Sequence, residues 1–395
     1  MNFSLYHLSD KFVFWNLRGI SHGYLQIIDS KGNKYFFGDN KNSLKAKLKI
    51  NDPSFCFNLL KKGSSGLGES YINNEFETKD LPLLIELIAK NINTIYKFSG
   101  LFQLYFLQTF LNKTKFSNTK EQSKKNVASH YDLGNEFFST WLDTGLTYSC
   151  GIFNTSNETL EKAQTNKYNK LIDLIKPRSG DKILEIGCGW GGFAEHLAKN
   201  YDVKLDCITI SQKQFLFTKA RINKAKLNHK VNVKFLDYRD IKKKYEAIAS
   251  IEMIEAVGKD YLHNYFQTIK KNLTANGKVG IQAITIDDKY FYRYKTKQDF
   301  IQKYIFPGGF LPSKMALYNC ANKNGLEINS YNSYGLHYSN TLILWRDEFL
   351  KKWDLISKQG FDLTFKRMWN FYLSYCEAGF KSKNIDLIQF SLQNR

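Results

Sequence analysis

A glycine-rich turn between an apolar strand and an amphipathic helix constrains the fold of this 395-residue chain most strongly. The segment reads Glu185-Ile-Gly-Cys-Gly-Trp-Gly-Gly and places Gly187, Gly189 and Gly191 at alternate positions. Glycine tolerates positive φ angles and lets the backbone approach a ligand closely. The spacing differs from the G-x-G-x-x-G of dinucleotide folds, and no Lys-Ser/Thr follows as in a phosphate-binding loop. The turn is therefore predicted to bind a different small ligand.

Short apolar strands and amphipathic helices alternate around this turn. We predict strands over residues 182–186, 205–210, 231–236, 247–251 and 278–286, and helices over 158–176, 192–200, 212–227 and 261–272. Such alternation indicates an α/β domain with a doubly wound, largely parallel sheet and helices on both faces. Ligands bind these sheets beyond the carboxyl ends of the strands, near the switch in strand order.

Residues 1–111 are predicted to form a separate, small α+β domain. The turn signal Lys31-Gly-Asn lies between two apolar segments and indicates a hairpin within residues 23–37. Helices are predicted over residues 81–90 and 92–111. The polar, basic residues 112–126 are predicted to be a linker to the second domain, residues 127–395.

Composition and charge narrow the functional classes only in part. The net charge of +20 suits a polyanionic partner, either nucleic acid or an anionic membrane face, but also a merely solvated lysine-rich surface. The six cysteines include no C-x-x-C pair, so neither a metal site nor a disulfide scaffold is indicated. No apolar run approaches the roughly 20 residues of a membrane-spanning helix, and no secretory signal is visible, so we expect a cytoplasmic location.

The glycine-rich segment resembles motif I of class I methyltransferases, which bind S-adenosylmethionine. The resemblance implies that Glu185 lies near the amino group of this cosubstrate and that Gly187, Gly189 and Gly191 pass under its methionine part. Many methyltransferases place an acidic residue after the second strand to bind the ribose. This chain has Thr209 and Gln214 there, and both offer neutral hydrogen-bonding groups.

The segment Asp237-Tyr-Arg-Asp follows the third strand and is expected to border the adenine through Tyr238 and Arg239. The ring of Tyr238 lies either along the base or at the protein surface.

Several further motifs, in order along the chain, resemble the cyclopropane-fatty-acyl-phospholipid synthases, which include the mycolic acid cyclopropane synthase-like methyltransferases. They are Gly66-Leu-Gly-Glu-Ser-Tyr, His130-Tyr-Asp-Leu-Gly-Asn-Glu-Phe-Phe, Leu146-Thr-Tyr-Ser-Cys-Gly-Ile-Phe, Ile251-Glu-Met-Ile-Glu-Ala-Val-Gly and Tyr304-Ile-Phe-Pro-Gly-Gly-Phe-Leu-Pro-Ser. The resemblance covers residues 45–392. It implies a class I methyltransferase domain, a small N-terminal lipid-associated domain, and methyl(ene) transfer from S-adenosylmethionine to the cis double bond of an unsaturated phospholipid acyl chain, which gives a cyclopropane.

By the same resemblance, Tyr148 and Ser149 join the cosubstrate site, and a bicarbonate ion lies beside the reacting carbon. The positions that match the bicarbonate ligands are Cys150, Glu255, Gln282, Ile284 and Tyr338, with Cys150 and Ile284 acting through their backbones. We expect Glu255 to orient the bicarbonate, and the bicarbonate to remove a proton from the added methyl group so that the ring closes. Two acidic groups in contact share a proton. Without the ion, Glu255 is itself the candidate base.

Gln282 departs from the family pattern, because the best-known members carry histidine in a His-Thr-Ile sequence where this chain has Gln282-Ala-Ile. Glutamine donates a hydrogen bond but carries no positive charge. Weaker bicarbonate binding and a methyl- or methylene-branched product therefore stay open as alternatives.

The expected partners are unsaturated phospholipids at the anionic inner face of the membrane, with the enzyme attached peripherally; a homodimer is left open. Nucleic acid is not expected, because the sequence has neither an N/D-P-P-Y-type motif nor a Pro-Cys catalytic setting. The rival hypotheses are a nucleic-acid methyltransferase and an inactive lipid-binding scaffold.

Overall fold

The computed structural model describes residues 2–97, 118–131, 133–296 and 298–395, and these form two compact units. One unit combines the described part of residues 1–115 with residues 360–384, and the other combines residues from 116–359 with 385–395. The predicted helix over 92–111 and the predicted linker over 112–126 lie partly outside the described residues. None of the described helices has both the length and the apolar character that crossing a membrane requires.

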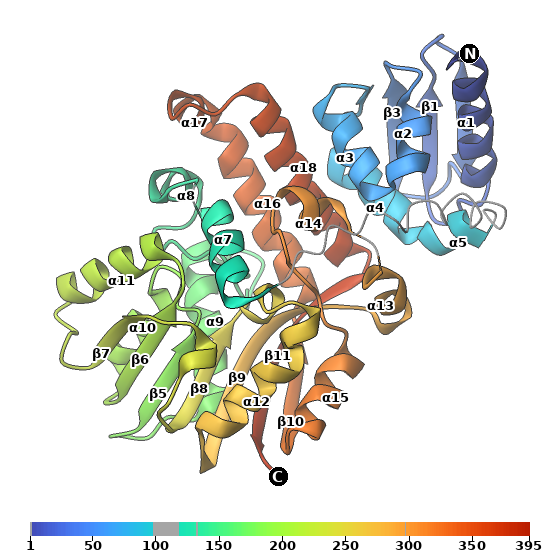
Figure 1. Cartoon of the computed structure of the whole chain (residues 1–395). Helices are drawn as coiled ribbons and strands as arrows, with labels where there is room; N and C mark the ends of the chain where they lie inside the picture. The colour runs from blue at the N-terminus through green and yellow to red at the C-terminus, as the bar shows by residue number, and fades with distance from the viewer. Residues whose placement is uncertain (1, 98–117, 132, 297) are drawn as a thin grey trace. The chain divides into compact units, whose positions relative to one another are not determined.

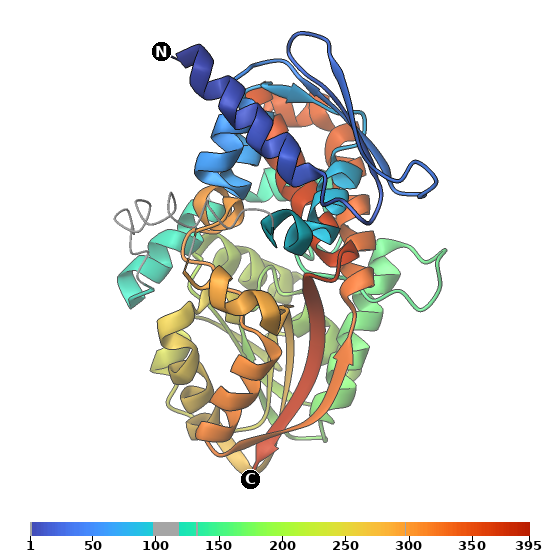
Figure 2. The same ribbon diagram turned by 90° about the vertical axis from the view of Figure 1, so that its right-hand side faces the viewer.

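The second unit is built on a seven-stranded sheet. Its strands are β5 (Lys182–Ile186), β6 (Lys204–Thr209), β7 (Val231–Phe235), β8 (Tyr245–Ile251), β9 (Leu273–Ile286), β10 (Leu326–Ser333) and β11 (Ile385–Asn394). The order is β10-β11-β9-β8-β5-β6-β7. Strands β5 to β9 are parallel to one another, whereas β11 is antiparallel to both β9 and β10 (Figures 1 and 2). The predicted fold class is confirmed, although the antiparallel β10 and β11 were not predicted.

Helices cover both faces of this sheet (Figure 1). Buried side chains of α9 (Leu160–Ile175), α10 (Gly192–Asn200) and α11 (Gln212–Lys224) share one apolar core with the sheet. Those of α12 (Leu262–Asn272) and α15 (Lys314–Lys323) share the core of the opposite face. The sequence explains this placement, because apolar residues recur every three to four positions along these helices.

The chain leaves β5 in one direction to form β6 and β7, and then returns to form β8 on the other side of β5. This reversal is the switch in strand order at which such sheets bind ligands. Three short turns follow the strand ends there, namely η2 (Tyr238–Asp240), η3 (Ile254–Ala256) and η4 (Lys259–Tyr261).

The remaining helices of the second unit are α7 (Lys120–Tyr131), α8 (Asn135–Trp141), α13 (Asp288–Tyr294), α14 (Phe300–Tyr304), α16 (Gly335–Lys351) and α17 (Trp353–Lys358). Residues 118–126, predicted as part of the linker, instead belong to this unit. Asn118 Nδ2 donates to the carbonyl of Gly308 (2.9 Å), and Lys120 forms an ion pair with Asp240. The polar composition that indicated a linker thus reflects side chains that bind backbone carbonyls and an acidic partner.

The first unit contains a four-stranded sheet in the order β2-β1-β3-β4. Strands β1 (Tyr24–Ile28) and β2 (Lys34–Gly38) form the predicted hairpin, and β1 pairs in parallel with β3 (Lys45–Ile50), which pairs with β4 (Phe76–Glu77). Its helices, among the residues that the structure describes, are α1 (Asn2–Leu17), α2 (Phe55–Lys62), α3 (Ser64–Ile72), α4 (Leu81–Lys90), α5 (Ile92–Lys97) and α18 (Leu363–Lys381).

Helix α18 lies in the region that the sequence analysis assigned to the second domain, but it groups with the first unit instead. Arg367 Nε donates to the carbonyl of Tyr71 (2.6 Å), and Asn370 Nδ2 donates to the Tyr71 hydroxyl (2.9 Å). The periodicity of a helix shows that one face is buried, but it does not show which distant segment buries it.

Candidate active site

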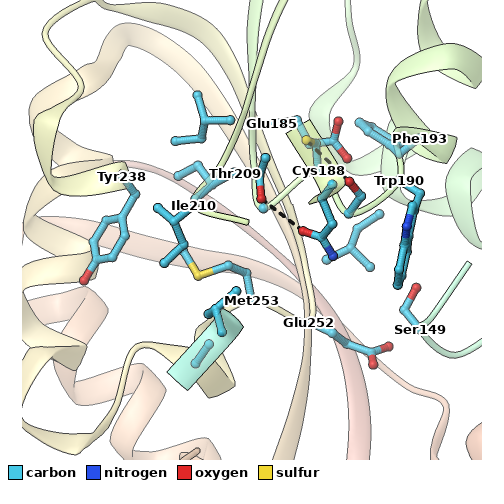
Figure 3. A pocket seen from close by; sticks show the side chains of 18 of the residues that line it. Ser149, Glu185, Cys188, Trp190, Phe193, Thr209, Ile210, Tyr238, Glu252 and Met253 are labelled. Atoms are coloured by element: carbon cyan, nitrogen blue, oxygen red, sulfur yellow. Dashed lines mark hydrogen bonds between the residues drawn. The ribbon is translucent and has the colours of Figure 1, made fainter. Parts of the chain in front are cut away.

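A pocket with about 1130 Å³ of empty space, part of it open to solvent, lies at the carboxyl ends of β5, β6 and β8. This is the position that the switch in strand order predicts. The pocket is lined by all of the predicted cosubstrate residues except Gly191, namely Tyr148, Ser149, Glu185, Gly187, Gly189, Thr209, Gln214, Tyr238 and Arg239 (Figure 3).

The glycine turn forms one wall of the pocket with its backbone. Gly187 has a φ of 82° and Gly189 a φ of 52°, a region that L side chains rarely adopt. A Cβ atom on Gly187 would lie 2.7 Å from Cγ of Met253. Gly191 does not line the pocket, and a Cβ there would lie 2.6 Å from Thr218 of α11, so its role is close helix packing.

Glu185 places a buried carboxylate in the wall next to this turn. Among the described residues, its Oε2 atom has no hydrogen-bond partner. Burial raises the pKa of Glu185 to about 8, although the charges of Lys167 and Arg221 oppose the shift. An unpaired buried carboxylate is costly, so this position is suited to a cationic ligand group. The amino group of S-adenosylmethionine fits this requirement.

Thr209 and Gln214 meet at the end of β6, as predicted. The hydroxyl of Thr209 donates to Oε1 of Gln214 (3.0 Å; dashed line in Figure 3) and accepts from the backbone N–H of Ser211 (3.1 Å). Ser211 in turn caps α11 by accepting from the N–H of Gln214. Both side chains are thus neutral and held in place, as a site for ribose hydroxyls requires.

Tyr238 and Arg239 lie at the end of β7 but differ in what they offer a ligand. Arg239 pairs with Asp237 through Nη2 and Oδ2 (2.7 Å) and through Nε and Oδ1 (2.8 Å), and its Nη1 donates to the carbonyl of Asn118 (3.0 Å). Arg239 therefore stabilises the wall. The hydroxyl of Tyr238 is buried without a hydrogen-bond partner among the described residues, and burial raises its pKa to about 12.

Of the five predicted bicarbonate ligands, four donate hydrogen bonds to carboxylates of the chain, and the fifth, Glu255, is one of these carboxylates. The five are Cys150, Glu255, Gln282, Ile284 and Tyr338. Oε1 of Glu252 accepts from the Cys150 N–H (2.9 Å) and from Gln282 Nε2 (2.8 Å), and Oε2 of Glu252 accepts from the Tyr338 hydroxyl (2.6 Å). Oε1 of Glu255 accepts from the Ile284 N–H (2.5 Å). Glu252 lines the pocket, whereas none of the five predicted residues does.

These contacts test whether a bicarbonate ion fits. The four donor groups that were expected to bind it already bind carboxylates of the chain itself. A further anion would also lie against Glu252, and like charges in contact oppose each other. The residues present therefore do not fit bicarbonate.

Three ionisable groups lie at this end of the pocket, with Lys167 fully buried and Glu252 and Glu255 partly buried. Burial raises the pKa of Glu252, while Tyr338 and Lys167 oppose the shift. Burial and the nearby Glu252 raise the pKa of Glu255 to about 8. Burial lowers the pKa of Lys167 to about 8 despite Glu252, and its Nζ donates to Oγ of Ser149 (2.6 Å).

Sequence reasoning missed Glu252 and Lys167. Glu252 lies three residues before Glu255 in the same motif, and the motif alone does not tell which of the two faces the pocket. Lys167 lies on α9, where a lysine ordinarily faces solvent, yet it is fully buried. Trp190 was also missed as a pocket residue; its indole N–H donates to Oδ1 of Asn135 (2.9 Å) and joins the glycine turn to α8.

An aromatic cluster adjoins the pocket at Tyr148. The Tyr148 ring centroid lies 5.2 Å from that of Phe138, 5.2 Å from that of Trp345 and 6.4 Å from that of Phe306. Phe138 and Trp345 are fully buried and pack behind Tyr148, whereas Tyr148 lines the pocket and Phe306 is half-buried. Tyr148 and Phe306 thus offer apolar rings with electron-rich faces near the predicted cosubstrate site.

Proteins of similar sequence are methyltransferases and cyclopropane synthases, which agrees with a cosubstrate site at the glycine turn. The family model described as mycolic acid cyclopropane synthetase matches residues 118–390. The tuberculostearic acid methyltransferase of Mycobacterium tuberculosis is 35% identical over 84% of this chain and 79% of that protein. The cyclopropane-fatty-acyl-phospholipid synthase of Escherichia coli K12 is 31% identical over 88% of this chain and 87% of that protein.

A solved structure shows the same fold. A mycolic acid cyclopropane synthase in complex with SAH and CTAB superposes with a TM-score of 0.65 and 28% identity. The match covers 69% of this chain and 98% of that chain.

Proposed function

The chain belongs to the mycolic acid cyclopropane synthetase family, and from that premise we propose that it methylates the cis double bond of an unsaturated phospholipid acyl chain. It is an S-adenosylmethionine-dependent methyltransferase. The observation that carries the proposal is a pocket that places two features together. At its glycine turn lies the buried carboxyl group of Glu185, whose Oε2 has no hydrogen-bond partner among the described residues, and an aromatic cluster adjoins it at Tyr148.

The residues at the ends of β5 and β6 account for binding of the cosubstrate. Glu185 pairs with its amino group, the backbone of Gly187 and Gly189 accommodates its methionine part, and Thr209 with Gln214 binds its ribose. When bound, S-adenosylmethionine supplies an electrophilic methyl group on a sulfonium centre.

The aromatic cluster accounts for the acyl chain. An isolated alkene is a weak nucleophile, so the protein must align it with the methyl group and exclude water. Tyr148 and Phe306 offer apolar surface for a hydrocarbon, and aromatic faces stabilise a cation that forms on the chain.

We propose a cyclopropane as the product, formed when a proton leaves the new methyl group. The second candidate is a methyl- or methylene-branched chain. It is favoured by Gln282, which stands where the best-known members carry histidine, and by the name of the 35% identical relative, a tuberculostearic acid methyltransferase.

The test uses purified enzyme, methyl-labelled S-adenosylmethionine and vesicles of unsaturated phospholipid. We expect label in the acyl chains, and none with saturated phospholipid. Proton NMR of the released fatty acids separates the products, since ring protons resonate far upfield of methylene protons. Enzyme that binds SAH but labels no unsaturated lipid would contradict the proposed function.

The net charge of +20 supports an anionic membrane surface as the place of reaction. In the same assay, we expect faster labelling of anionic than of neutral vesicles, with the difference removed by high salt. Equal rates on both kinds of vesicle would argue against attachment by charge.

A further inference from the structure

We infer that Glu252 is a carboxylate base built into the chain at the place where the family resemblance expects bicarbonate, so that this enzyme needs no bicarbonate ion. The inference rests on the proposed function and names the group that takes the proton in that reaction.

The first support is the set of donors around Glu252. The Cys150 N–H (2.9 Å), Gln282 Nε2 (2.8 Å) and the Tyr338 hydroxyl (2.6 Å) all donate to its two oxygens. Cys150, Gln282 and Tyr338 are three of the five positions that match bicarbonate ligands. These three donors, which we call the cradle, thus hold a planar carboxylate group, and that carboxylate is a side chain of the protein itself.

The second support is the orientation of Gln282. Nε2 of Gln389 on β11 donates to Oε1 of Gln282 (2.9 Å) and to the carbonyl of Lys167 (3.3 Å). This contact directs Nε2 of Gln282 towards Glu252. A carboxylate already attached to the chain loses little translational freedom on entering the cradle, so a neutral glutamine suffices as a donor. The glutamine at position 282, where the best-known family members carry histidine, is therefore explained by the carboxylate of Glu252 beside it.

The third support is the backbone of Glu252, which has a φ of 48°. A residue other than glycine is strained in this region, and such strain is concentrated at functional sites. The N–H of Glu252 donates to the carbonyl of Gln282 (2.8 Å), which holds the strained residue against β9. The sequence therefore keeps a glutamate where glycine would be favoured by conformation.

The fourth support is position. Glu252 lines the pocket and lies beside Ser149, away from Tyr238 (Figure 3). Glu255 is not among the lining residues, and its Oε1 binds the Ile284 N–H. Of these two carboxylates, Glu252 is the one that faces the ligand space.

The reaction balances with Glu252 as the base. The alkene electron pair forms a carbon–carbon bond to the sulfonium methyl group, and the sulfur–methyl bond breaks with its electrons kept by sulfur. The cation lies on the neighbouring chain carbon. Glu252 removes a proton from the new methyl group, and the freed C–H electron pair forms the third ring bond. For a methylene product, a hydride first shifts from the methylated carbon to the cation, and the same proton loss then forms the double bond.

The test compares label transfer in buffer freed of carbon dioxide with the same buffer plus added bicarbonate. We expect wild-type rates that agree within about twofold, since a general base contributes about 10²–10⁴-fold and this base is already present. Stimulation by bicarbonate of about tenfold or more would overturn the inference while leaving the proposed function intact. Absence of label under both conditions would overturn the proposed function and the inference with it.

Two variants separate the charge of Glu252 from its volume. Glu252→Gly empties the cradle at a φ that glycine favours, so it is expected to fold. Its rate should fall by about 100-fold or more and recover by about tenfold with added bicarbonate or formate. Glu252→Gln fills the cradle without a charge and should lose as much with no recovery. The matched control is Glu161→Gln at an exposed position on α9, which should keep the wild-type rate.

A binding measurement checks the same inference without turnover. NMR titration of ¹³C-bicarbonate into the SAH-loaded protein should show no saturable binding to wild type and saturable binding to Glu252→Gly. Saturable binding to the wild-type protein, or a Glu252→Gln variant as active as wild type, would overturn the inference. Retained SAH affinity in both variants shows that they are folded.

Discussion

The two ends of the pocket are built in different ways. At the end of β5 and β6, the glycine turn presents backbone, and the buried Oε2 of Glu185 has no hydrogen-bond partner among the described residues. At the end of β8 and β9, Glu252 accepts hydrogen bonds from Cys150, Gln282 and Tyr338 within the protein. The first end is incomplete without a ligand, whereas the second is already organised.

Because of this difference, we expect the first end to determine the affinity for the cosubstrate and the second end to determine the rate of the reaction. A group without a partner gains one when the ligand arrives, so changes at the first end should alter affinity for the cosubstrate. A preorganised polar group acts on the reacting atoms without first having to rearrange. Changes at the second end should therefore alter the rate of reaction more than the affinity.

Gly187→Ala tests the first end with the largest expected effect. The substitution adds strain at a φ of 82° and a Cβ atom 2.7 Å from Met253 Cγ, so the turn must shift. We expect SAH affinity, measured by calorimetry, to fall by about 100-fold, since distortions of a few kcal/mol correspond to this factor. Gly180→Ala is the matched control, because Gly180 has a φ of 85° with nothing near its Cβ position. If both variants lost the same SAH affinity, backbone strain alone would explain the effect, and the contact with Met253 would not be needed.

Glu185→Gln tests the charge at the same end, with an effect of about tenfold on SAH affinity. The pKa of Glu185 is raised to about 8, so at pH 7 the carboxyl group is mostly protonated before the ligand binds. Pairing with an amino group favours the carboxylate and lowers its pKa, so binding releases a proton and affinity rises with pH up to about pH 8. Calorimetry in buffers of different ionisation enthalpy measures this release. The variant should lose it, and a wild-type affinity independent of pH would contradict the assignment.

Glu255→Gln should have the smallest effect, about two- to threefold on kcat at pH 7. Because the pKa of Glu255 is raised to about 8, its side chain is mostly neutral there, and glutamine still accepts from the Ile284 N–H. The difference from wild type should grow above about pH 8, where the carboxyl group ionises. A pH profile of kcat checks this. A loss as large as that of Glu252→Gln would show that the two carboxylates act as one unit.

The sequence predicted the location and local structure of the first end because its signals are local. The bounds predicted for β5 and α10 match the structure, and the glycines between them have the positive φ angles that their type favours. Thr209 and Gln214 follow directly from the end of β6. Each of these residues is placed by its neighbours in the chain.

The second end could not be predicted as well, because it depends on contacts between distant strands. Glu252 and Glu255 are three residues apart, and a left-handed residue followed by a short turn decides which one meets Cys150 and Gln282. No pattern of apolar residues encodes that choice. Lys167 is similar, since its burial depends on Ser149 from another segment.

The chain passes from the larger unit into the smaller one at residues 360–384 and then returns to the larger unit at residues 385–395. Because of this path, neither unit can be produced as one continuous fragment of the chain. Strand β11 closes the larger sheet between β9 and β10, yet it follows α18, a helix of the smaller unit. A fragment that ends after α17 would lack the strand that carries Gln389, and a fragment confined to the N-terminal residues would lack α18. Neither unit is a transplantable module, so protein engineers who wish to recombine such enzymes must exchange both segments together.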